Sequence, residues 1–94
     1  MSFEWHNPKE EKNLLKHGIT FRMAANAFDD PNALFVEDTA HSIHERRQWV
    51  IGDSERGILV VVFTIRHPGR TIRIISARTA SRKERRIYEE NKRV

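Results

Sequence analysis

The chain has 94 residues, 38% of them hydrophobic and 32% charged, which suits one domain over residues 1–94 with a single small core. It has no cysteine, which excludes disulfides and zinc–thiolate sites and favours the reducing cytoplasm as its location. Its opening residues lack the pattern of a secretory signal, and its longest apolar run, residues 58–63, is too short to cross a bilayer.

A strand and a helix are predicted at the start of the chain. Residues 2–6 alternate apolar and polar side chains, as a half-buried strand does. Asn7, which a proline follows, has the signature of a helix N-cap, and Gly18 has that of a left-handed helix end. Leu14 and Leu15 are expected to supply the buried stripe of this first helix.

A second, shorter helix is predicted over residues 21–28. Thr20 can cap its N-terminus, and its apolar side chains recur at the three- and four-residue spacing of one buried face. Four strands are then expected. They are predicted at residues 33–37, 46–52, 58–65 and 71–78, with a polar loop at 38–45 and turns at 53–57 and 67–70.

The strand at residues 58–65 is continuously apolar, so it should be central and covered on both faces. Ser81 and Glu84 have the spacing of a capping box for a last helix, whose main apolar residues are Ile87 and Tyr88. The resulting order, β-α-α-β-β-β-β-α, predicts an α+β fold in which two N-terminal helices and one C-terminal helix accompany a mainly antiparallel sheet.

Positive charge is concentrated in the last third of the chain. Residues 66–94 contain ten Lys and Arg against three Asp and Glu, whereas residues 1–65 contain seven against ten. This polarity favours a polyanion, such as nucleic acid, as a partner. A solvated helix face with Glu–Arg pairs is the alternative.

Arg66 and Arg78 are the best placed of these cations, because each follows an apolar strand and neither has an obvious partner. In an antiparallel hairpin, Arg66 lies near the turn, Arg73 toward the middle and Arg78 at the far end, so no direct contact between Arg66 and Arg78 is implied. Guanidinium groups bind phosphate oxygens in pairs and keep their charge, which suits a phosphoryl-transfer transition state. Each arginine could equally be a solvated strand end.

Other side chains suggest weaker sites. His17 lies at the negative end of the first helix and is a candidate for acid–base chemistry, or it merely caps carbonyl groups. Trp5 suits the core, whereas Trp49 could stack on a base from a sheet face. No metal or other cofactor is expected, because spacing fixes no third ligand beside His41 and His44, which suit an exposed loop.

Six segments in a fixed order carry a more specific signal. They are Phe3-Glu4-Trp5, Asn13 to Phe21, Ala27 to Pro31, Gln48 to Gly52, Leu59 to Thr64, and Ile72 to Glu89. Together they resemble the BrnT toxin family over nearly the whole chain, and their joint occurrence is more specific than any one motif. The resemblance implies a RelE-like ribonuclease fold and the role of toxin in a type II toxin–antitoxin system.

The resemblance also implies partners and site residues. The usual partner is a BrnA-type antitoxin with a ribbon-helix-helix domain, which implies a two-toxin, two-antitoxin complex that reaches operator DNA only through the antitoxin. The matching positions are His17, Arg66 and Arg78, with Trp49 and Arg82 as lesser candidates. Many relatives carry an acid between the residues that match Thr64 and Arg66, where this chain has Ile65. If that acid is the base in the relatives, either this copy is weakened or another group acts as the base.

The resulting hypothesis is a small mRNA endoribonuclease that needs no metal and inhibits translation. The 2′-OH of the RNA would attack the adjacent phosphate and leave a cyclic phosphate. Arg66 and Arg78 would hold the phosphorane, His17 would transfer protons, and Trp49, Arg73, Arg82 and Lys83 would contact the RNA. The alternative is a non-catalytic nucleic-acid-binding or protein-interaction module with a basic surface.

Overall fold

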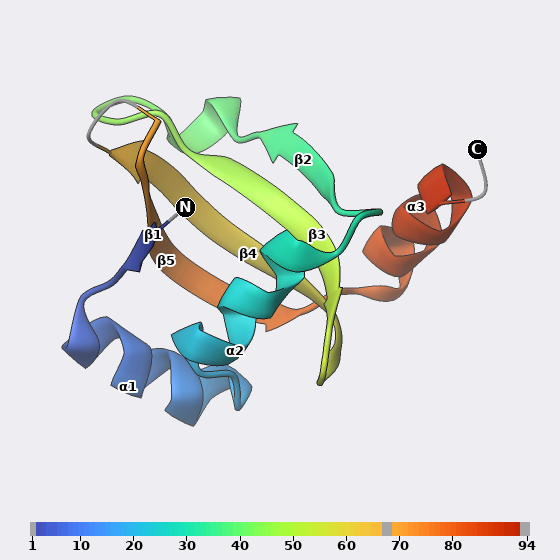
Figure 1. The fold of residues 1–94 in the computed structure, drawn as a ribbon, viewed down its shortest axis with the longest axis horizontal. Helices are drawn as coiled ribbons and strands as arrows, with labels where there is room; N and C mark the ends of the chain where they lie inside the picture. Colours follow the sequence, from blue (N-terminus) through green and yellow to red (C-terminus); the bar gives the residue numbers. More distant parts are fainter. Residues whose placement is uncertain (1, 67–68, 93–94) are drawn as a thin grey trace.

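A computed structural model describes residues 2–66 and 69–92 and confirms the predicted α+β fold and the order of its elements (Figure 1). The elements are β1 (Ser2–Glu4), α1 (Asn7–His17), α2 (Phe21–Ala25), the 3₁₀ helix η1 (Asn26–Asp29), β2 (Leu34–Glu37), the 3₁₀ helix η2 (Thr39–His41), β3 (Gln48–Ser54), β4 (Gly57–Arg66), β5 (Thr71–Thr79) and α3 (Arg82–Lys92). His67 and Pro68 of the predicted turn at 67–70 lie outside the described residues. No helix in the described part is long and apolar enough to cross a membrane.

The sheet has five strands in the order β1-β5-β4-β3-β2, so β4 is central, as predicted. Neighbouring strands are antiparallel, except that β1 pairs with β5 in parallel. The apolar side chains of β4 explain its central position, because they enter buried clusters on both sides of the sheet. Leu59, Val61 and Phe63 lie in one buried cluster, and Val60 lies in another.

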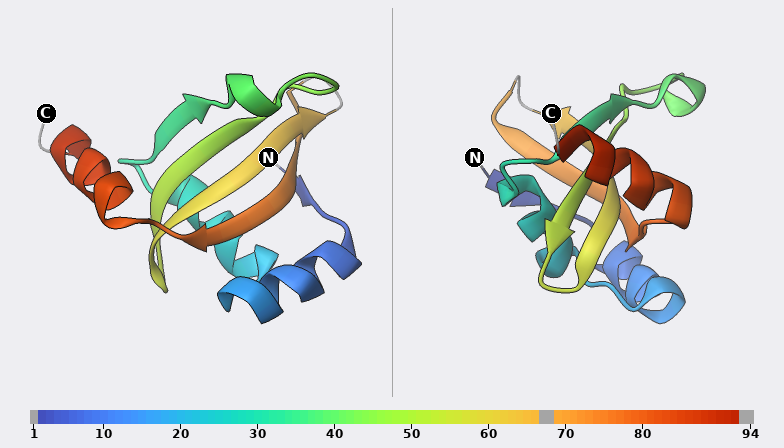
Figure 2. Two further views of the ribbon diagram at one scale, coloured as in Figure 1. Left: turned by 180° about the vertical axis from the view of Figure 1, so that it is seen from behind. Right: turned by 90° about the vertical axis from the view of Figure 1, so that its right-hand side faces the viewer.

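The two faces of the sheet are covered unequally. The face that carries Leu59, Val61 and Phe63, here called the helical face, packs against α2 and η1. The opposite face, here called the open face, is covered at one end by α3, where Tyr88 packs with Val60. In Figure 1, α2 lies in front of the sheet, and in the view from behind α3 lies beside the end of the sheet rather than across it (Figure 2, left).

Helix α1 departs from its prediction in what it buries. Leu14 and Leu15 are 46% and 88% exposed, so the expected leucine stripe is wrong. The buried residue is Asn13, whose amide donates to the carbonyl groups of Ile19 and Ala77 at 2.9 and 2.8 Å and accepts from the Ala77 N–H at 3.1 Å. The side chain therefore satisfies the edge of β5 beyond the point where β1 pairs with it.

The helix ends follow the sequence signals with one exception. His6, not Asn7, is the N-cap of α1, and Asn7 is already helical. Gly18 ends α1 in the left-handed conformation, with φ of 72°, and the Thr20 side chain accepts from the Met23 N–H at the start of α2, both as predicted.

The second helix, predicted at residues 21–28, is divided into α2 and the tighter 3₁₀ helix η1, and η1 packs directly on β3. Gly52 makes this approach possible, because a Cβ at that position would lie 2.4 Å from the Ala27 carbonyl oxygen.

Helix α3 begins with the predicted capping box. Ser81 Oγ accepts from the Glu84 N–H at 3.2 Å, and the Glu84 carboxylate accepts from the Ser81 N–H at 2.8 Å. Tyr88 is buried, and its hydroxyl donates to the Asp30 carboxylate just after η1. Burial, together with this carboxylate, raises the pKa of Tyr88, so the hydroxyl keeps its proton and joins α3 to the rest of the domain.

Candidate active site

The register of β4 and β5 places three arginines on the open face. Arg73 lies opposite Thr64, and Arg78 lies opposite Val60. A register shift between these two pairs inserts one extra residue into β5. Positions 73 and 78, which strict alternation would put on opposite faces, therefore share one face with Arg66 at the end of β4.

Arg66 and Arg78 nevertheless lie far apart. Arg66 ends β4, whereas Arg78 pairs with Val60, six residues earlier in the same strand. At about 3.3 Å per residue, their backbones are roughly 20 Å apart. The expectation that both hold one phosphorane is therefore replaced by two separate arginine sites.

The site around Arg78 is built on an ion pair. Its two terminal nitrogens donate to the two carboxylate oxygens of Glu84 at 2.6 and 2.8 Å. The hydrogen bond from Arg78, followed by those from Ser81, outweighs burial and lowers the pKa of Glu84 to about 2. The expectation of an unpaired Arg78 is thus wrong, because the capping carboxylate of α3 also reaches back to β5.

The site around Arg66 contains a second arginine. Arg66 Nη2 donates to Oε2 of Glu45 at 3.5 Å, and Nε of Arg47 lies 3.8 Å from Oε1 of the same carboxylate. Arg66, too, therefore has a partner, contrary to expectation. Nε of Arg47 is buried and makes no hydrogen bond to any described residue. Two guanidinium groups thus share one carboxylate, and Arg47 keeps an unused donor.

A histidine–carboxylate pair lies beside these groups. His41 Nδ1 is 3.1 Å from both carboxylate oxygens of Asp38, which also accepts from the Trp49 indole N–H at 3.0 Å. The Asp38 side chain is 8% exposed, whereas that of His41 is 67% exposed. Burial alone would raise the pKa of Asp38, but the hydrogen bonds from Trp49 and His41 lower it below its ordinary value, so the carboxylate stays charged.

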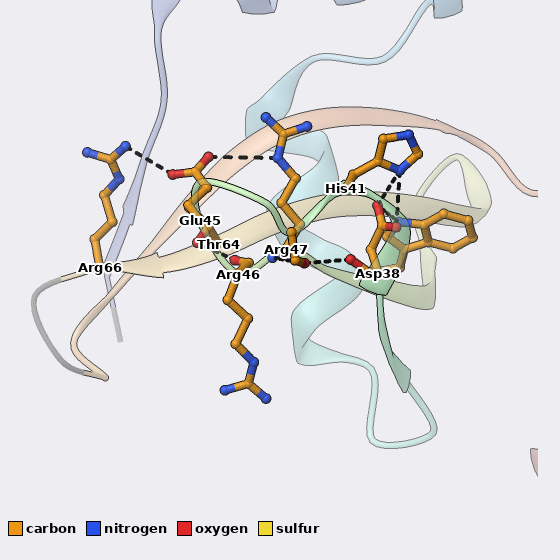
Figure 3. Close-up of polar contacts among 9 residues, drawn as sticks. Asp38, His41, Glu45, Arg46, Arg47, Thr64 and Arg66 are labelled. Atoms are coloured by element: carbon orange, nitrogen blue, oxygen red, sulfur yellow. Dashed lines mark hydrogen bonds and ion pairs between the residues drawn. The ribbon is translucent and has the colours of Figure 1, made fainter.

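Two hydroxyl groups fix the loop between β2 and β3 that supplies these residues. Ser42 Oγ donates to the Asp38 carbonyl at 2.5 Å and accepts from the Arg47 N–H at 3.0 Å. Thr64 Oγ1 of β4 donates to the Arg46 carbonyl at 2.6 Å. Figure 3 shows the result, in which the side chains of Arg66, Glu45, Arg47 and His41 stand on one side of the loop and that of Arg46 points to the other.

The side chains of Arg66, Glu45, Arg47 and His41 are here called the loop site, and the last three of them line a hollow in the surface. A pocket of about 310 Å³ is lined by Ala40, His41, Ile43, His44, Glu45 and Arg47. Its ionisable groups are two imidazoles, a carboxylate and a guanidinium. Within residues 2–66 and 69–92, no three His, Cys, Asp or Glu side chains gather closely enough to hold a metal ion.

Ile65 does not belong to the loop site. It lines a pocket of about 300 Å³ with Phe35 and Phe63 of the helical face, whereas Arg66 follows on the open face. An acid at this position would therefore point away from Arg66, and the acid that contacts Arg66 here is Glu45.

His17 lies in a third place. Together with Lys9, Lys12 and Lys16 it lines a groove of about 200 Å³ along α1, where the helix meets Ile75 and Ser76 of β5. Its surroundings are basic, and it contacts neither of the arginine sites through a described hydrogen bond.

The residues expected to contact RNA are spread over the open face and α3. Trp49 lies on the open face with Ile51 and Val60, and Trp5 packs in the helical core, as expected. Arg73 donates to Glu4 of β1 at 2.7 Å. Arg82 and Lys83 are exposed on α3.

Sequence reasoning missed most of the loop site. Asp38, Glu45 and Arg47 were treated as members of a polar loop and its neighbouring strand, and His41 as an exposed loop histidine. The available signal was the density of ionisable side chains between two strands. That signal alone does not indicate that Thr64 and Ser42 would order the loop.

The fold and the site define a class of protein. An α+β domain with one helix-covered face, and with arginines and an oriented histidine on the other, suits binding and chemistry on an extended polyanion. A family described as the ribonuclease toxin, BrnT, of type II toxin–antitoxin systems matches residues 5–84. The chain belongs to this family, which confirms the resemblance found in the sequence. No curated protein matches the chain.

Proposed function

We propose that this chain is a metal-independent endoribonuclease that cleaves mRNA at the loop site and so inhibits translation. The observation that carries the proposal is that Arg66 and Arg47 both lie against the carboxylate of Glu45, which lines a pocket together with Arg47. Family membership supplies the reaction class, a ribonuclease toxin, and implies an RNA target and an antitoxin.

The chemistry needs no group that the chain lacks. The 2′-OH of the RNA attacks the adjacent phosphorus, the bond to the 5′-oxygen breaks, and a 2′,3′-cyclic phosphate remains. A phosphate that takes the place of the Glu45 carboxylate would receive donors from both Arg66 and Arg47. These fixed charges stabilise the extra negative charge of the phosphorane, and such a contact is typically worth about 3 kcal/mol.

The other candidate residues bind the RNA on either side of the cleaved bond. Arg78 and Arg73 share the open face with Arg66, so one extended strand can contact all three through different phosphates. Trp49 offers a ring for stacking, and the remaining contacts come from His17, Arg82 and Lys83. In this scheme His17 binds RNA or transfers a proton from the edge of β5, away from the loop site.

The antitoxin is expected to resemble BrnA, with a ribbon-helix-helix domain. Arg82, Lys83, Arg85 and Arg86 are exposed on α3 and give it a basic surface. An acidic partner that covers α3 and the open face would block RNA directly. Because ribbon-helix-helix domains pair, we expect two toxins and two antitoxins in a complex in the cytoplasm, which contacts operator DNA only through the antitoxin.

The competing function is a binding module that has a basic surface and no chemistry. Incubation of the purified chain with a 5′-labelled mRNA in EDTA separates the two. New, discrete RNA fragments would support the nuclease. A shifted but intact RNA would support the binding module and contradict the proposed reaction.

A further inference from the structure

The loop site contains a group that is built for proton transfer. His41 stands 67% exposed at the pocket, but its Nδ1 atom is held 3.1 Å from both oxygens of a nearly buried carboxylate, Asp38. Trp49 and Ser42 hold Asp38 in turn, because the indole N–H donates to its carboxylate and Ser42 Oγ donates to its backbone carbonyl. An ordinary surface histidine has no such support.

The contact fixes which nitrogen of the ring can react. A charged carboxylate only accepts hydrogen bonds, so Nδ1 carries the proton that it donates to Asp38. In the neutral ring, Nε2 then has a free lone pair. The hydrogen-bonded side of the ring is turned toward Asp38, and the pocket is shared with Glu45 and Arg47.

The charged groups around His41 differ in their positions and in their partners. Asp38 faces the ring from the end of β2, whereas Glu45 and Arg47 line the same pocket from the other side of the loop, and Arg66 reaches Glu45 from β4. The carboxylate of Glu45 pairs with two guanidinium groups, so its role is to position the two arginines. The other ring nitrogen of His41, Nε2, makes no hydrogen bond to any described residue.

We propose that His41 is the general base of the ribonuclease, oriented by Asp38. The assignment rests on the proposed function and names the base that Ile65 does not provide. Nε2 takes the proton of the 2′-OH as the bond between the 2′-oxygen and phosphorus forms. The bond from phosphorus to the 5′-oxygen breaks, and the leaving oxygen takes a proton from water. Arg66 and Arg47 hold the phosphate throughout.

The chain offers a matched control outside the pocket. His6, the N-cap of α1, is exposed, makes no described side-chain hydrogen bond and does not line the pocket. We expect His41→Gly to lower the rate of RNA cleavage about a hundredfold or more, and His6→Gly to stay within about twofold of the parent. Added imidazole should restore part of the activity of His41→Gly, because it can enter the vacated space as a free base, and should not alter His6→Gly.

Asp38 is a positioning residue, and its role has its own readout. Asp38→Asn should weaken the preference for a proton on Nδ1, which ¹⁵N NMR of the His41 ring in the folded variant detects directly. A purely structural carboxylate would lower the melting temperature and leave the ring tautomer unchanged.

The decisive experiment measures cleavage of one defined mRNA by the parent, His41→Gly, Glu45→Gln and His6→Gly proteins, each with and without imidazole. A parent that cleaves, a folded His41→Gly variant that does not, and rescue by imidazole are the expected results. Equal rates for His41→Gly and the parent would overturn the assignment while leaving the nuclease intact. Loss of cleavage in Glu45→Gln with full activity in His41→Gly would transfer the role of base to Glu45. A parent that leaves the RNA whole would overturn the proposed function and this assignment together.

Discussion

Arg78 and Glu84 join β5 to α3 through two parallel hydrogen bonds of 2.6 and 2.8 Å. The same carboxylate accepts from the Ser81 N–H at the start of α3. One side chain thus caps the helix and ties it to the sheet, which matters because Tyr88 is the one residue of α3 buried in the described structure. The attachment of α3 therefore depends on the charge of Glu84.

The first prediction concerns the pH dependence of stability. The folded pKa of Glu84, about 2, is below its ordinary value of 4.5, so the carboxylate contributes stability above pH 4.5 that is lost as the pH falls toward 2. Urea unfolding of the parent and of Glu84→Gln should differ by about 1–2 kcal/mol at pH 7 after screening at this partly exposed pair. The difference should shrink below pH 4.5. A constant difference down to pH 3 would contradict this role.

The second prediction compares Arg66 with a surface arginine that has no role in the proposed site. Arg66→Ala should abolish growth arrest and lower RNA cleavage about a hundredfold, because a donor to the phosphorane is lost. Its free energy of unfolding should change by less than about 0.5 kcal/mol, because the pair with Glu45 is long and exposed. Arg56→Ala, in the exposed turn between β3 and β4, is the control and should remain toxic. Full toxicity of a folded Arg66→Ala protein would remove Arg66 from the site.

The third prediction concerns the buried amide in α1. Asn13→Ala should lower the free energy of unfolding by about 3 kcal/mol, because it leaves the N–H and C=O of Ala77 and the C=O of Ile19 without partners. Leu15→Ala, two residues away and 88% exposed, should change it by less than about 0.5 kcal/mol. Urea melts of both variants test the pair, and a larger loss for Leu15→Ala would contradict the packing of α1.

The fourth prediction concerns the antitoxin. Binding should weaken steeply as salt rises, because exposed cations on α3 are expected to meet an acidic partner. The double variant Arg82→Glu with Lys83→Glu should weaken it further, and the complex should melt above the free toxin. Calorimetry at two salt concentrations and light scattering of the co-expressed pair measure affinity and stoichiometry. A salt-insensitive complex that leaves Arg66 and Arg78 open to solvent would contradict direct blocking.

The sequence predicted most of the fold because local signals agreed with it. Gly18, Thr20 and Ser81 mark helix ends through their own backbone or side-chain chemistry, and the apolar run of β4 indicates its central position. The prediction of which residues α1 buries was wrong. In place of its leucines the helix buries the amide of Asn13, which bonds the edge of β5, and the periodicity of the sequence does not reveal this.

The loop site was only partly predictable, because its contacts join residues far apart in the chain. Arg66 meets Glu45 across 21 positions, and Thr64 holds the loop across 18. The shared face of Arg73 and Arg78 depends on one extra residue in β5, which strict alternation does not anticipate. Arg66 was found because its position at a strand end is visible in the sequence, whereas its partners were not.

The most direct test of the central claim is mass spectrometry of the RNA ends that the purified chain produces in EDTA. One substrate is a short RNA with a single cleaved linkage, and the other is identical except for a 2′-deoxyribose at that linkage. The account predicts a 2′,3′-cyclic phosphate and a 5′-hydroxyl from the first substrate and no cleavage of the second. Fragments with a 5′-phosphate, or cleavage of the deoxyribose substrate, would contradict attack by the 2′-OH.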